Sequence, residues 1–310
     1  MLEVLEALLS STLEYSTALV FAALGAVLSE RVGVVNVGVE GMMRAGAFCA
    51  AVAALSMPTP LGVLMGMIAG AAMAAVHGYL CIRWRSDQVV SGMALNLVAL
   101  AGGTYLLESL YGPNGTPPIT QLSRWHLPFG LAEVPLLRAF SGHSVLTWVA
   151  LALPFAFHWV LYRSPLGLRL RAVGEKPHAV ATLGLSVQNL RWLAVLGGGA
   201  LAGLGGAALS TAVLDRFEQH TPAGLGFMAM AAMVFGRWTP RGAFLAALFF
   251  AAGNALRIGL ASSLPEIKDV VPQGFLLALP YLLTLLLLAI QGQRTHAPAA
   301  LGVPYEQESR

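Results

Sequence analysis

Long apolar runs, separated by short polar connections that contain Pro and Gly, cover most of this chain. The runs lack the polar face of a helix on a water-soluble protein, and most reach the roughly 17 to 25 residues needed to cross a bilayer. They predict a polytopic bundle of about eight to ten transmembrane helices. The expected spans lie near residues 12–28, 34–56, 60–82, 88–110, 144–162, 190–212, 224–236, 242–261 and 270–290.

Composition excludes the soluble classes of protein. Apolar residues make up 57% of the 310 residues and charged residues 11%, and the mean hydropathy is +0.72. A water-soluble domain is about a quarter charged, so residues 1–310 are expected to form a single all-α integral membrane domain. The N-terminus carries acidic residues and no Lys or Arg, which favours a permanent first helix over a cleaved leader.

Basic residues are divided unequally between the two sets of loops. Most of the 18 Lys and Arg fall on one side, and the positive-inside rule places that side in the cytoplasm. The N-terminus is then expected outside the cell, and the C-terminal tail, 291–310, inside. The residues on the inner side are Arg31, Arg83, Arg85, Arg163, Arg169, Arg171, Lys176, Arg191, Arg237, Arg241, Arg294 and Arg310.

Two connections differ from the others. The outer connection 111–143 contains five prolines, which argues against a long helix and for a constrained surface loop. The inner segment 163–190 is basic at its start, and Pro177 and Gly184 stand where a helix would begin and where it would just have ended. We predict a short helix on the cytoplasmic face, from that proline to Leu183.

Small residues recur every fourth position in two of the runs, a spacing that lets helix backbones approach closely in lipid. Two interpretations stay open: packing inside the subunit, and contact between two subunits. The residues are Gly62, Gly66, Gly70, Ala74, Gly78, Gly199 and Gly203.

Glu40 and Arg44 fall inside an expected span, where a charge costs about 2.5 to 3.5 kcal/mol on insertion scales. They are four residues apart with the acid first, the favourable order for an ion pair on a helix. They either form a structural pair or line a path for solute. Three glycines interrupt the same stretch and Asn36 supplies an amide, a composition compatible with a broken helix that lines a polar cavity.

Other candidates for the path have two interpretations each. Ser91 and Asn96 can hydrogen-bond a polar solute or hold neighbouring helices together. Phe227 can stack on a ring of the solute or anchor its helix at the membrane edge. With Asn36 and Glu40, these residues make up the candidate translocation path.

Several motifs are absent from the sequence. No Gly-Lys pair exists, so no Walker A phosphate loop can form, and neither a Gly-x-Ser-x-Gly nor a His-Glu-x-x-His pattern occurs. No His, Cys or carboxylate cluster has ligand spacing. We therefore expect no enzyme activity, no ATP hydrolysis by this chain, and neither a cofactor nor a metal. The net charge of +3 reports on orientation and does not imply nucleic acid binding.

Five segments carry a family likeness in a fixed order. They read LSERVGVVNVGVEGMMRAGAF at 28–48, SDQVVSGMALNLVAL at 86–100, RSPLGLRLRAVGEKPHAVATLGLSV at 163–187, GLGFMAMAAMVFGRWTPRGA at 224–243 and APAALGVPYE at 297–306. Together they resemble the permease subunits of ABC importers of the nucleoside and simple-sugar branch, which includes ribose permeases. The likeness spans nearly the whole chain.

The resemblance implies the ABC importer permease fold and several partners. These are ABC ATPase subunits on the cytoplasmic side, a second, homologous permease subunit, and an extracytoplasmic substrate-binding lipoprotein. The family more usually carries an apolar residue where Arg44 stands, so no solute contact is carried over to Glu40. The stretch that looks like the ATPase-coupling segment matches Gly174, Glu175, Pro177, Ala181, Leu183 and Gly184.

The function that the resemblance implies is nucleoside import by alternating access across the bacterial cytoplasmic membrane. A permease of the same family for a simple sugar such as ribose is an alternative, because no residue separates ribose from ribose bearing a base. An ion-driven secondary transporter is a third, but it would normally show paired carboxylates inside the membrane, and only Glu40 resembles one.

Overall fold

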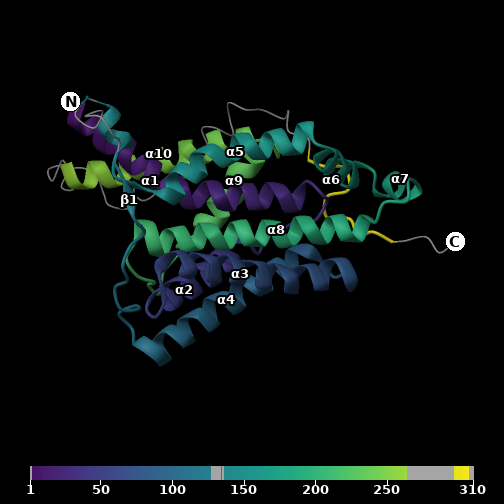
Figure 1. Ribbon diagram of the computed structural model, residues 1–310. Coiled ribbons are helices and arrows are strands. Elements are labelled where there is room, and N and C mark those ends of the chain that lie inside the picture. Colours follow the sequence, from purple (N-terminus) through teal and green to yellow (C-terminus); the bar gives the residue numbers. More distant parts are fainter. Residues whose placement is uncertain (1, 127–133, 135, 264–296, 307–310) are drawn as a thin grey trace.

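The computed structural model describes residues 2–126, 134, 136–263 and 297–306. These residues form a bundle of long helices, with two short strands that pair antiparallel near one end (Figure 1). Helix α3 and helix α8 each continue into one π-helical turn, at Tyr79–Arg83 and Leu209–Val213. The elements are α1 Leu2–Glu30, α2 Val39–Ala54, α3 Thr59–Gly78, α4 Gln88–Tyr111, β1 Arg124–Trp125, β2 His143–Ser144, α5 Val145–Arg163, α6 Pro165–Glu175, α7 Pro177–Thr182, α8 Val187–Ala208, α9 Leu225–Phe235 and α10 Pro240–Ser263.

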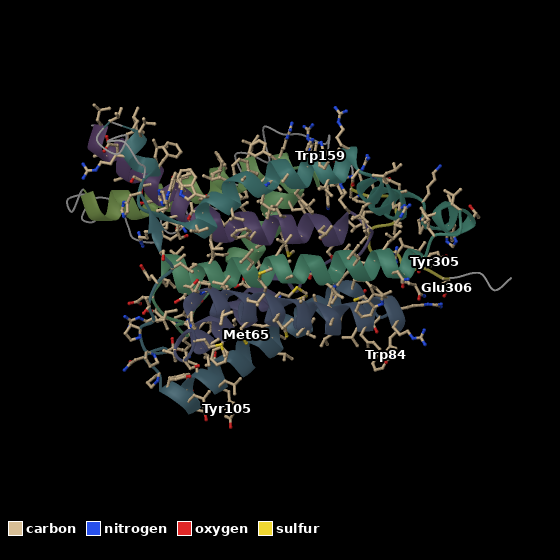
Figure 2. The ribbon with its side chains drawn as sticks, in the orientation of Figure 1. Met65, Trp84, Tyr105, Trp159, Tyr305 and Glu306 are labelled. Atoms are coloured by element: carbon tan, nitrogen blue, oxygen red, sulfur yellow. The ribbon has the colours of Figure 1, made fainter. Side chains whose placement is uncertain are left out.

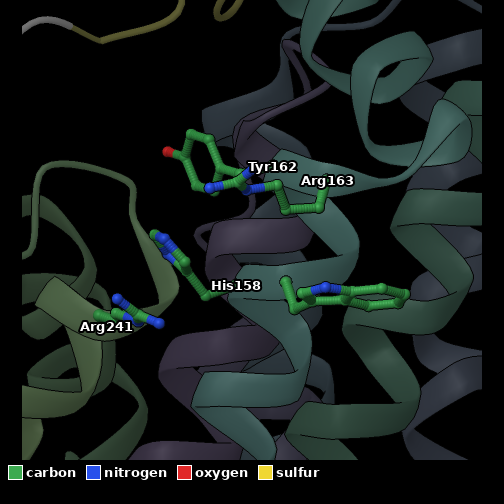
Figure 3. A pocket seen from close by; sticks show the side chains of 5 residues that line it. His158, Tyr162, Arg163 and Arg241 are labelled. Carbon is green, nitrogen blue, oxygen red and sulfur yellow. The ribbon is translucent and has the colours of Figure 1, made fainter.

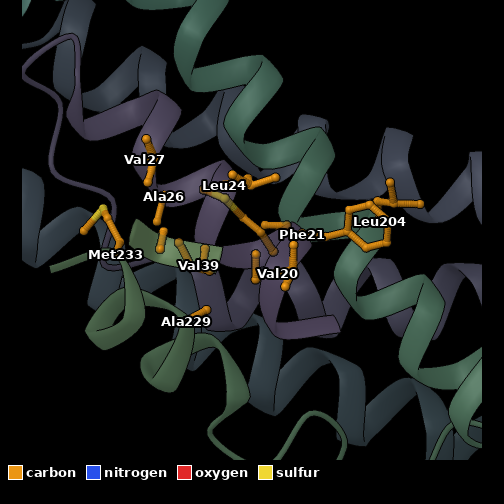
Figure 4. Close-up of a cluster of buried hydrophobic side chains, with 14 of the residues drawn as sticks. Val20, Phe21, Leu24, Ala26, Val27, Val39, Leu204, Ala229 and Met233 are labelled. Atoms are coloured by element: carbon orange, nitrogen blue, oxygen red, sulfur yellow. The ribbon is translucent and has the colours of Figure 1, made fainter. Parts of the chain in front are cut away.

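Helices α1 and α8 run side by side through the centre and are mostly buried (Figure 1). Helices α2 and α3 pack on α8, with α4 outside them, while α9, α10 and α5 pack on α1. Figure 4 shows part of the core between them, where Phe21 of α1 lies near Leu204 of α8 and Met233 of α9 lies on the opposite side of the same cluster. Helices α6 and α7 lie at one end of the bundle, here called the α7 end, and β1 lies at the other.

The predicted membrane bundle is confirmed. Within the described residues, five helices are long and apolar enough to cross a membrane: α1, α3 with its π turn, α4, α5 and α8. Helices α2, α9 and α10 coincide with three further expected spans. The expected span at 270–290 lies outside the described residues.

One expected span needs correction, and the span at 224–236 is confirmed as shorter than a full crossing. The span at 34–56 was wrong at its start, because residues 31–38 are not helical and α2 begins at Val39. The short run near 230 is a helix of 11 residues, α9, about 16 Å long at 1.5 Å per residue. It covers about half of a 30 Å hydrocarbon core and is preceded by a non-helical segment, 214–224.

The small residues pack inside the subunit, as the first of their two interpretations predicted. A Cβ added at Gly66 would lie 2.7 Å from the carbonyl oxygen of Gly46, and one added at Gly70 would lie 2.6 Å from Cα of Gly203. On another face of α8, a Cβ at Gly205 would lie 2.7 Å from the carbonyl oxygen of Ala18. Backbones of α1, α2 and α3 thus approach α8 to distances that leave no room for a side chain.

Gly203→Ala is expected to destabilise the protein by about 1 to 3 kcal/mol, the usual cost of overpacking. Its Cβ would lie 2.9 Å from Cα of Gly70 and would also meet the carbonyl oxygen of Gly66. Gly102→Ala is the matched control, because nothing lies within 4 Å of its Cβ and alanine favours the helix. Thermal unfolding in detergent measures both, and equal stability of the two variants would contradict the packing.

The outer connection is constrained, as its prolines predicted, over the residues that the structure describes. Its backbone runs along the segment that follows α8, with the N–H groups of Thr116, Ile119 and Leu122 donating to carbonyls of that segment at 2.9, 2.7 and 3.0 Å. Strands β1 and β2 close its far end. This connection therefore fixes the start of the non-helical stretch that leads to α9.

Candidate functional site

Two stretches of non-helical backbone interrupt the bundle, 31–38 between α1 and α2 and 214–224 before α9. At membrane depth, such backbone is tolerated only where protein groups or a water-filled cavity satisfy its N–H and C=O groups. Most of the polar residues singled out in the sequence turn out to be the partners of these two stretches.

Side chains of α3 and α4 bond the first stretch. His77 Nε2 lies 2.9 Å from the carbonyl oxygen of Val35, and the N–H of Val35 donates to Gln88 Oε1 at 2.7 Å. Asn96 Nδ2 donates to the carbonyl oxygen of Val37 at 2.9 Å, and its Oδ1 accepts from an N–H in the first turn of α2 at 2.7 Å. Asn96 thus holds α4 to α2, which is the second of its two interpretations.

Ser91 and Asn36 lie within the same network. Ser91 Oγ is 3.0 Å from His77 Nδ1, so the serine orients the ring that bonds the first stretch. Asn36 is fully buried, and its Nδ2 points to the sulfur of Met42 at 3.5 Å. Its Oδ1 is buried and has no hydrogen-bond partner among the described residues. Ser91 is therefore a positioning residue, while Asn36 keeps a free acceptor.

Asn96→Ala is expected to lower the free energy of unfolding by about 1 to 3 kcal/mol, because a carbonyl and an N–H beside α2 both lose their partner. Leu97→Ala serves as the control on the same helix, since Leu97 is 66% exposed. Thermal unfolding of both variants in detergent measures the difference. An Asn96→Ala protein as stable as the Leu97→Ala protein would show that Asn96 does not hold the two helices together.

Glu40 bonds the second stretch at the beginning of α9. Its Oε1 accepts from the N–H of Gly224 at 2.8 Å, and its Oε2 accepts from the N–H of Gly226 at 2.6 Å. Gly224 has φ +87°, a left-handed conformation that glycine adopts without strain. A carboxylate in this position satisfies N–H groups that have no partner within the helix and complements the positive end of its dipole.

Arg44 bonds the same stretch from the next turn of α2. Its Nη1 donates to the carbonyl oxygen of Thr221 at 2.8 Å, and its Nη2 donates to the carbonyl oxygen of Gln219 at 2.7 Å and to Thr104 Oγ1 at 3.0 Å. The residue is 4% exposed, and the guanidinium carbon lies 5.5 Å from the centre of the Phe217 ring. Arg44 therefore joins α2, α4 and the stretch before α9.

The ion pair between Glu40 and Arg44, one of their two interpretations, is not formed. None of the ion pairs among the described residues joins them, and each instead bonds backbone groups of residues 219–226. Helical spacing places the two side chains on one face of α2. The N–H and C=O groups of residues 219–226 bond these side chains instead. Their joint role is to hold the N-terminal part of α9 against α2.

Phe227 lies in the first turn of α9, next to the glycine that Glu40 bonds, and is 49% exposed. The structure thus divides the five path candidates into two groups, one at each of the two non-helical stretches. Asn36, Ser91 and Asn96 belong to the first interruption, and Glu40 and Phe227 to the second. Among the described residues no three His, Cys, Asp or Glu side chains could hold a metal ion.

The α7 end carries the predicted short helix. Helix α7 runs from Pro177 to Thr182, and Gly184 follows it with φ +77°. Leu183 is 78% exposed, so the helix presents an apolar side chain to its surroundings. Ala181 is partly buried on the hydrophobic core. The geometry matches the surface element that the coupling segment was expected to form, and its role stays a prediction.

Residues 297–306 of the tail cross the α7 end as a strap that turns at 299–302 (Figure 2). The N–H of Ala300 donates to the carbonyl oxygen of Gly174 at 2.8 Å, and the N–H of Gly302 donates to that of Gly33 at 3.1 Å. The N–H of Ala299 donates to Glu175 Oε2 at 3.4 Å. The strap therefore ties α6 to the first non-helical stretch.

The end of the strap reaches α7 and the loop before α4. The Tyr305 ring lies 5.3 Å from that of His178 on α7, and Glu306 forms a 2.7 Å ion pair with Arg85. Arg191 of α8 donates from both Nη atoms to the carbonyl oxygen of Val303 at 3.3 Å and is 2% exposed. The sequence analysis counted Arg191 among the basic residues of the cytoplasmic side and missed this role. No residue near Arg191 in the sequence indicates that it bonds the carbonyl of Val303.

Comparison with known proteins identifies the fold that this geometry represents. A family model described as a branched-chain amino acid transport system permease component matches residues 8–280. The chain belongs to this permease family. It is 39% identical to the guanosine ABC transporter permease protein NupQ of Bacillus subtilis over 99% of each chain. It is 38% identical to the nucleoside ABC transporter permease protein NupC of Lactococcus lactis over 97% of each.

More distant relatives carry a different name. The putative glucose ABC transporter permease protein TsgC13 of Haloferax volcanii is 35% identical over 97% of this chain and 98% of its own length. The glucose ABC transporter permease protein TsgB13 of the same organism is 29% identical over 87% of this chain and 76% of its own length. No solved structure matches the chain. Membership of the permease family confirms the resemblance found in the sequence and makes this chain a multi-pass membrane protein of the ABC transporter class.

Proposed function

We propose that this permease is one transmembrane subunit of an ATP-driven importer of nucleosides in the bacterial cytoplasmic membrane. The observation that carries the proposal is the likeness over nearly the full length to permeases named for guanosine and for nucleosides, at 39% and 38% identity. The relatives named as glucose permeases are less similar, at 35% and 29% identity. The N-terminus lies outside, and the α7 end, which carries most of the arginines, lies in the cytoplasm.

The partners follow from the same comparison. Bacillus subtilis and Lactococcus lactis each have a second, more distant relative of this chain, at 28% and 27% identity, with a name of the same type. A second, homologous permease subunit is therefore proposed to complete the path. Separate ATPase subunits are proposed because the sequence has no phosphate-binding loop. They are proposed to bind around α7, whose sequence resembles the coupling segment. An extracytoplasmic binding lipoprotein is proposed to deliver the solute.

Alternating access is proposed to start at α7. Closure of the ATPases on ATP shifts the equilibrium between outward-open and inward-open states only if they bind one state better. The strap links α7 to residues 31–38 through Tyr305 and Gly302. Those residues lead directly into α2, whose Glu40 holds the beginning of α9. A shift of α7 is thereby passed to the half-length helix beside the path.

Uptake by the assembled transporter tests this function. The chain is co-expressed with a candidate ATPase, second permease and binding lipoprotein from the same genome, in a strain without nucleoside uptake. Labelled guanosine and adenosine are expected to accumulate, and an ATPase variant lacking its phosphate-loop lysine abolishes accumulation. Accumulation of ribose or glucose in place of nucleosides would refute the cargo. Uptake that persists without the ATPase but stops with an uncoupler would refute the class.

A further inference from the structure

A basic, aromatic pocket opens between the last turns of α5 and the start of α10, away from the candidate path and from α7. It has a volume of about 390 Å³ and is lined by His158, Trp159, Tyr162, Arg163 and Arg241. Figure 3 shows His158 between Tyr162 on its own helix and Arg241 on the facing helix. The pocket thus has two cationic side chains from two different helices.

The positive charge of this pocket is not neutralised within the described part of the chain. Arg163 and Arg241 have neither an ion pair nor a hydrogen bond from their side chains there, although the Arg241 guanidinium lies 5.8 Å from the Phe155 ring centre. Two more arginines lie behind Tyr162: Arg31 donates to its hydroxyl at 3.0 Å, and the Arg171 guanidinium carbon is 4.7 Å from its ring centre.

His158 provides an independent indication of a missing partner. Its Nδ1 is buried and has no hydrogen-bond partner among the described residues. The ring lies 4.5 Å from that of Tyr162 at an angle of 33°, so it is held in place by stacking. Buried polar atoms normally have a partner. An unbonded ring nitrogen in a pocket lined by two guanidinium groups without an ion pair fits an oxygen-rich anion.

The position of the pocket indicates where that anion comes from. Trp159, 64% exposed, lies on the outward face of α5 (Figure 2), and Phe155 of the same helix is 49% exposed. Helix α5 is apolar enough to span the bilayer and ends at Arg163. Tryptophan next to a helix end is typical of the membrane interface. Helices α6 and α7, where a cytoplasmic protein would bind, project beyond this level (Figure 1).

We propose that this pocket binds the headgroup phosphate of an anionic phospholipid of the inner leaflet, such as phosphatidylglycerol or cardiolipin. Arg163 and Arg241 bind the phosphate oxygens, a geometry that suits the planar guanidinium fork. His158 and Tyr162 supply further hydrogen bonds, and the acyl chains run along the exposed aromatic face of α5. Basic pockets between helices at the cytoplasmic side of a membrane have the charge that such headgroups require.

Lipid titration of the purified, full-length chain tests the proposal. Native mass spectrometry in detergent measures binding of dioleoyl phosphatidylglycerol, with dioleoyl phosphatidylcholine and inorganic phosphate in parallel. The Arg163→Gln/Arg241→Gln variant is expected to bind phosphatidylglycerol about tenfold more weakly or worse. The control, Arg169→Gln/Arg83→Gln, removes two charges from the same end outside the pocket and is expected to change affinity less than about twofold.

Three outcomes overturn the proposal. Equal weakening in both double variants would mean that only overall charge matters, and equal binding of phosphatidylcholine would mean unspecific lipid contact. Displacement of phosphatidylglycerol by inorganic phosphate at similar concentration would assign the pocket to a free anion. If the double variant unfolds, the single variants Arg163→Gln and Arg241→Gln replace it, since each must weaken binding severalfold if both groups bind the phosphate.

Discussion

Replacing Arg44 with leucine is expected to abolish uptake and to lower the free energy of unfolding by about 2 to 5 kcal/mol, because buried carbonyls lose a charged donor. The two carbonyls belong to Gln219 and Thr221, which Arg44 bonds at 2.7 and 2.8 Å. Both lie in the non-helical stretch that leads to α9. Without the guanidinium, these two carbonyls lose their side-chain donor, and the beginning of α9 is no longer held beside α2 by Arg44.

Arg216→Leu is the matched control for this variant. Arg216 lies in the same stretch, but it is exposed and pairs with Asp215 on the surface at 2.8 Å. Exposed ion pairs contribute about 0 to 1 kcal/mol, so uptake and stability should stay near those of the unmodified protein. Labelled nucleoside uptake and thermal unfolding in detergent are measured for both. An Arg44→Leu protein that behaves like Arg216→Leu would refute the structural role of Arg44.

A double variant separates the two interpretations of the charged residues. If Glu40 and Arg44 only neutralised one another, Glu40→Gln with Arg44→Leu would restore what Arg44→Leu alone loses. The structure gives each of them its own backbone partners, at Gly224 and Gly226 for the acid and Thr221 for the base. The double variant is therefore expected to be at least as unstable as the single one.

The spans were predictable because membrane helices leave a local signature. A run of about 20 apolar residues is a property of the sequence itself, and each expected span up to residue 263 coincides with a helix. The break before Val39 was foreseen from its glycines, but its extent was not. Non-helical backbone at 31–38 depends on side chains of α3 and α4, such as His77 and Asn96, that no local pattern connects to it.

The candidate site was predictable in its residues but not in its partners. Glu40 was a candidate because it is a charged residue inside an expected span. Its hydrogen-bond partners, however, lie 184 and 186 positions away along the chain. Helical periodicity identifies only those neighbours of a charged residue that lie on the same helix, which is why an ion pair with Arg44 was one of the two interpretations. The buried Arg191 was missed for the same reason, because its acceptor lies 112 positions away in the tail.

Leu183→Glu is expected to leave the fold intact and to remove transport. The side chain is 78% exposed at the end of α7, and a substitution at such a site changes stability by about 0.5 kcal/mol or less. If α7 binds the ATPase, a charge at this apolar contact should weaken the complex by about 2 kcal/mol or more, roughly 30-fold. Co-purification of the ATPase, ATP hydrolysis and nucleoside uptake are measured together.

Two variants make this result specific to α7. Leu183→Met keeps an apolar side chain and should retain uptake, while Val303→Glu places the same charge on an exposed residue of the strap at the same end, 54% exposed. Uptake lost in Leu183→Glu and kept in both controls would assign ATPase binding to α7. Full uptake in Leu183→Glu would place the ATPase elsewhere. The strap from Tyr305 to residues 31–38 would then not transmit an ATPase-driven movement of α7.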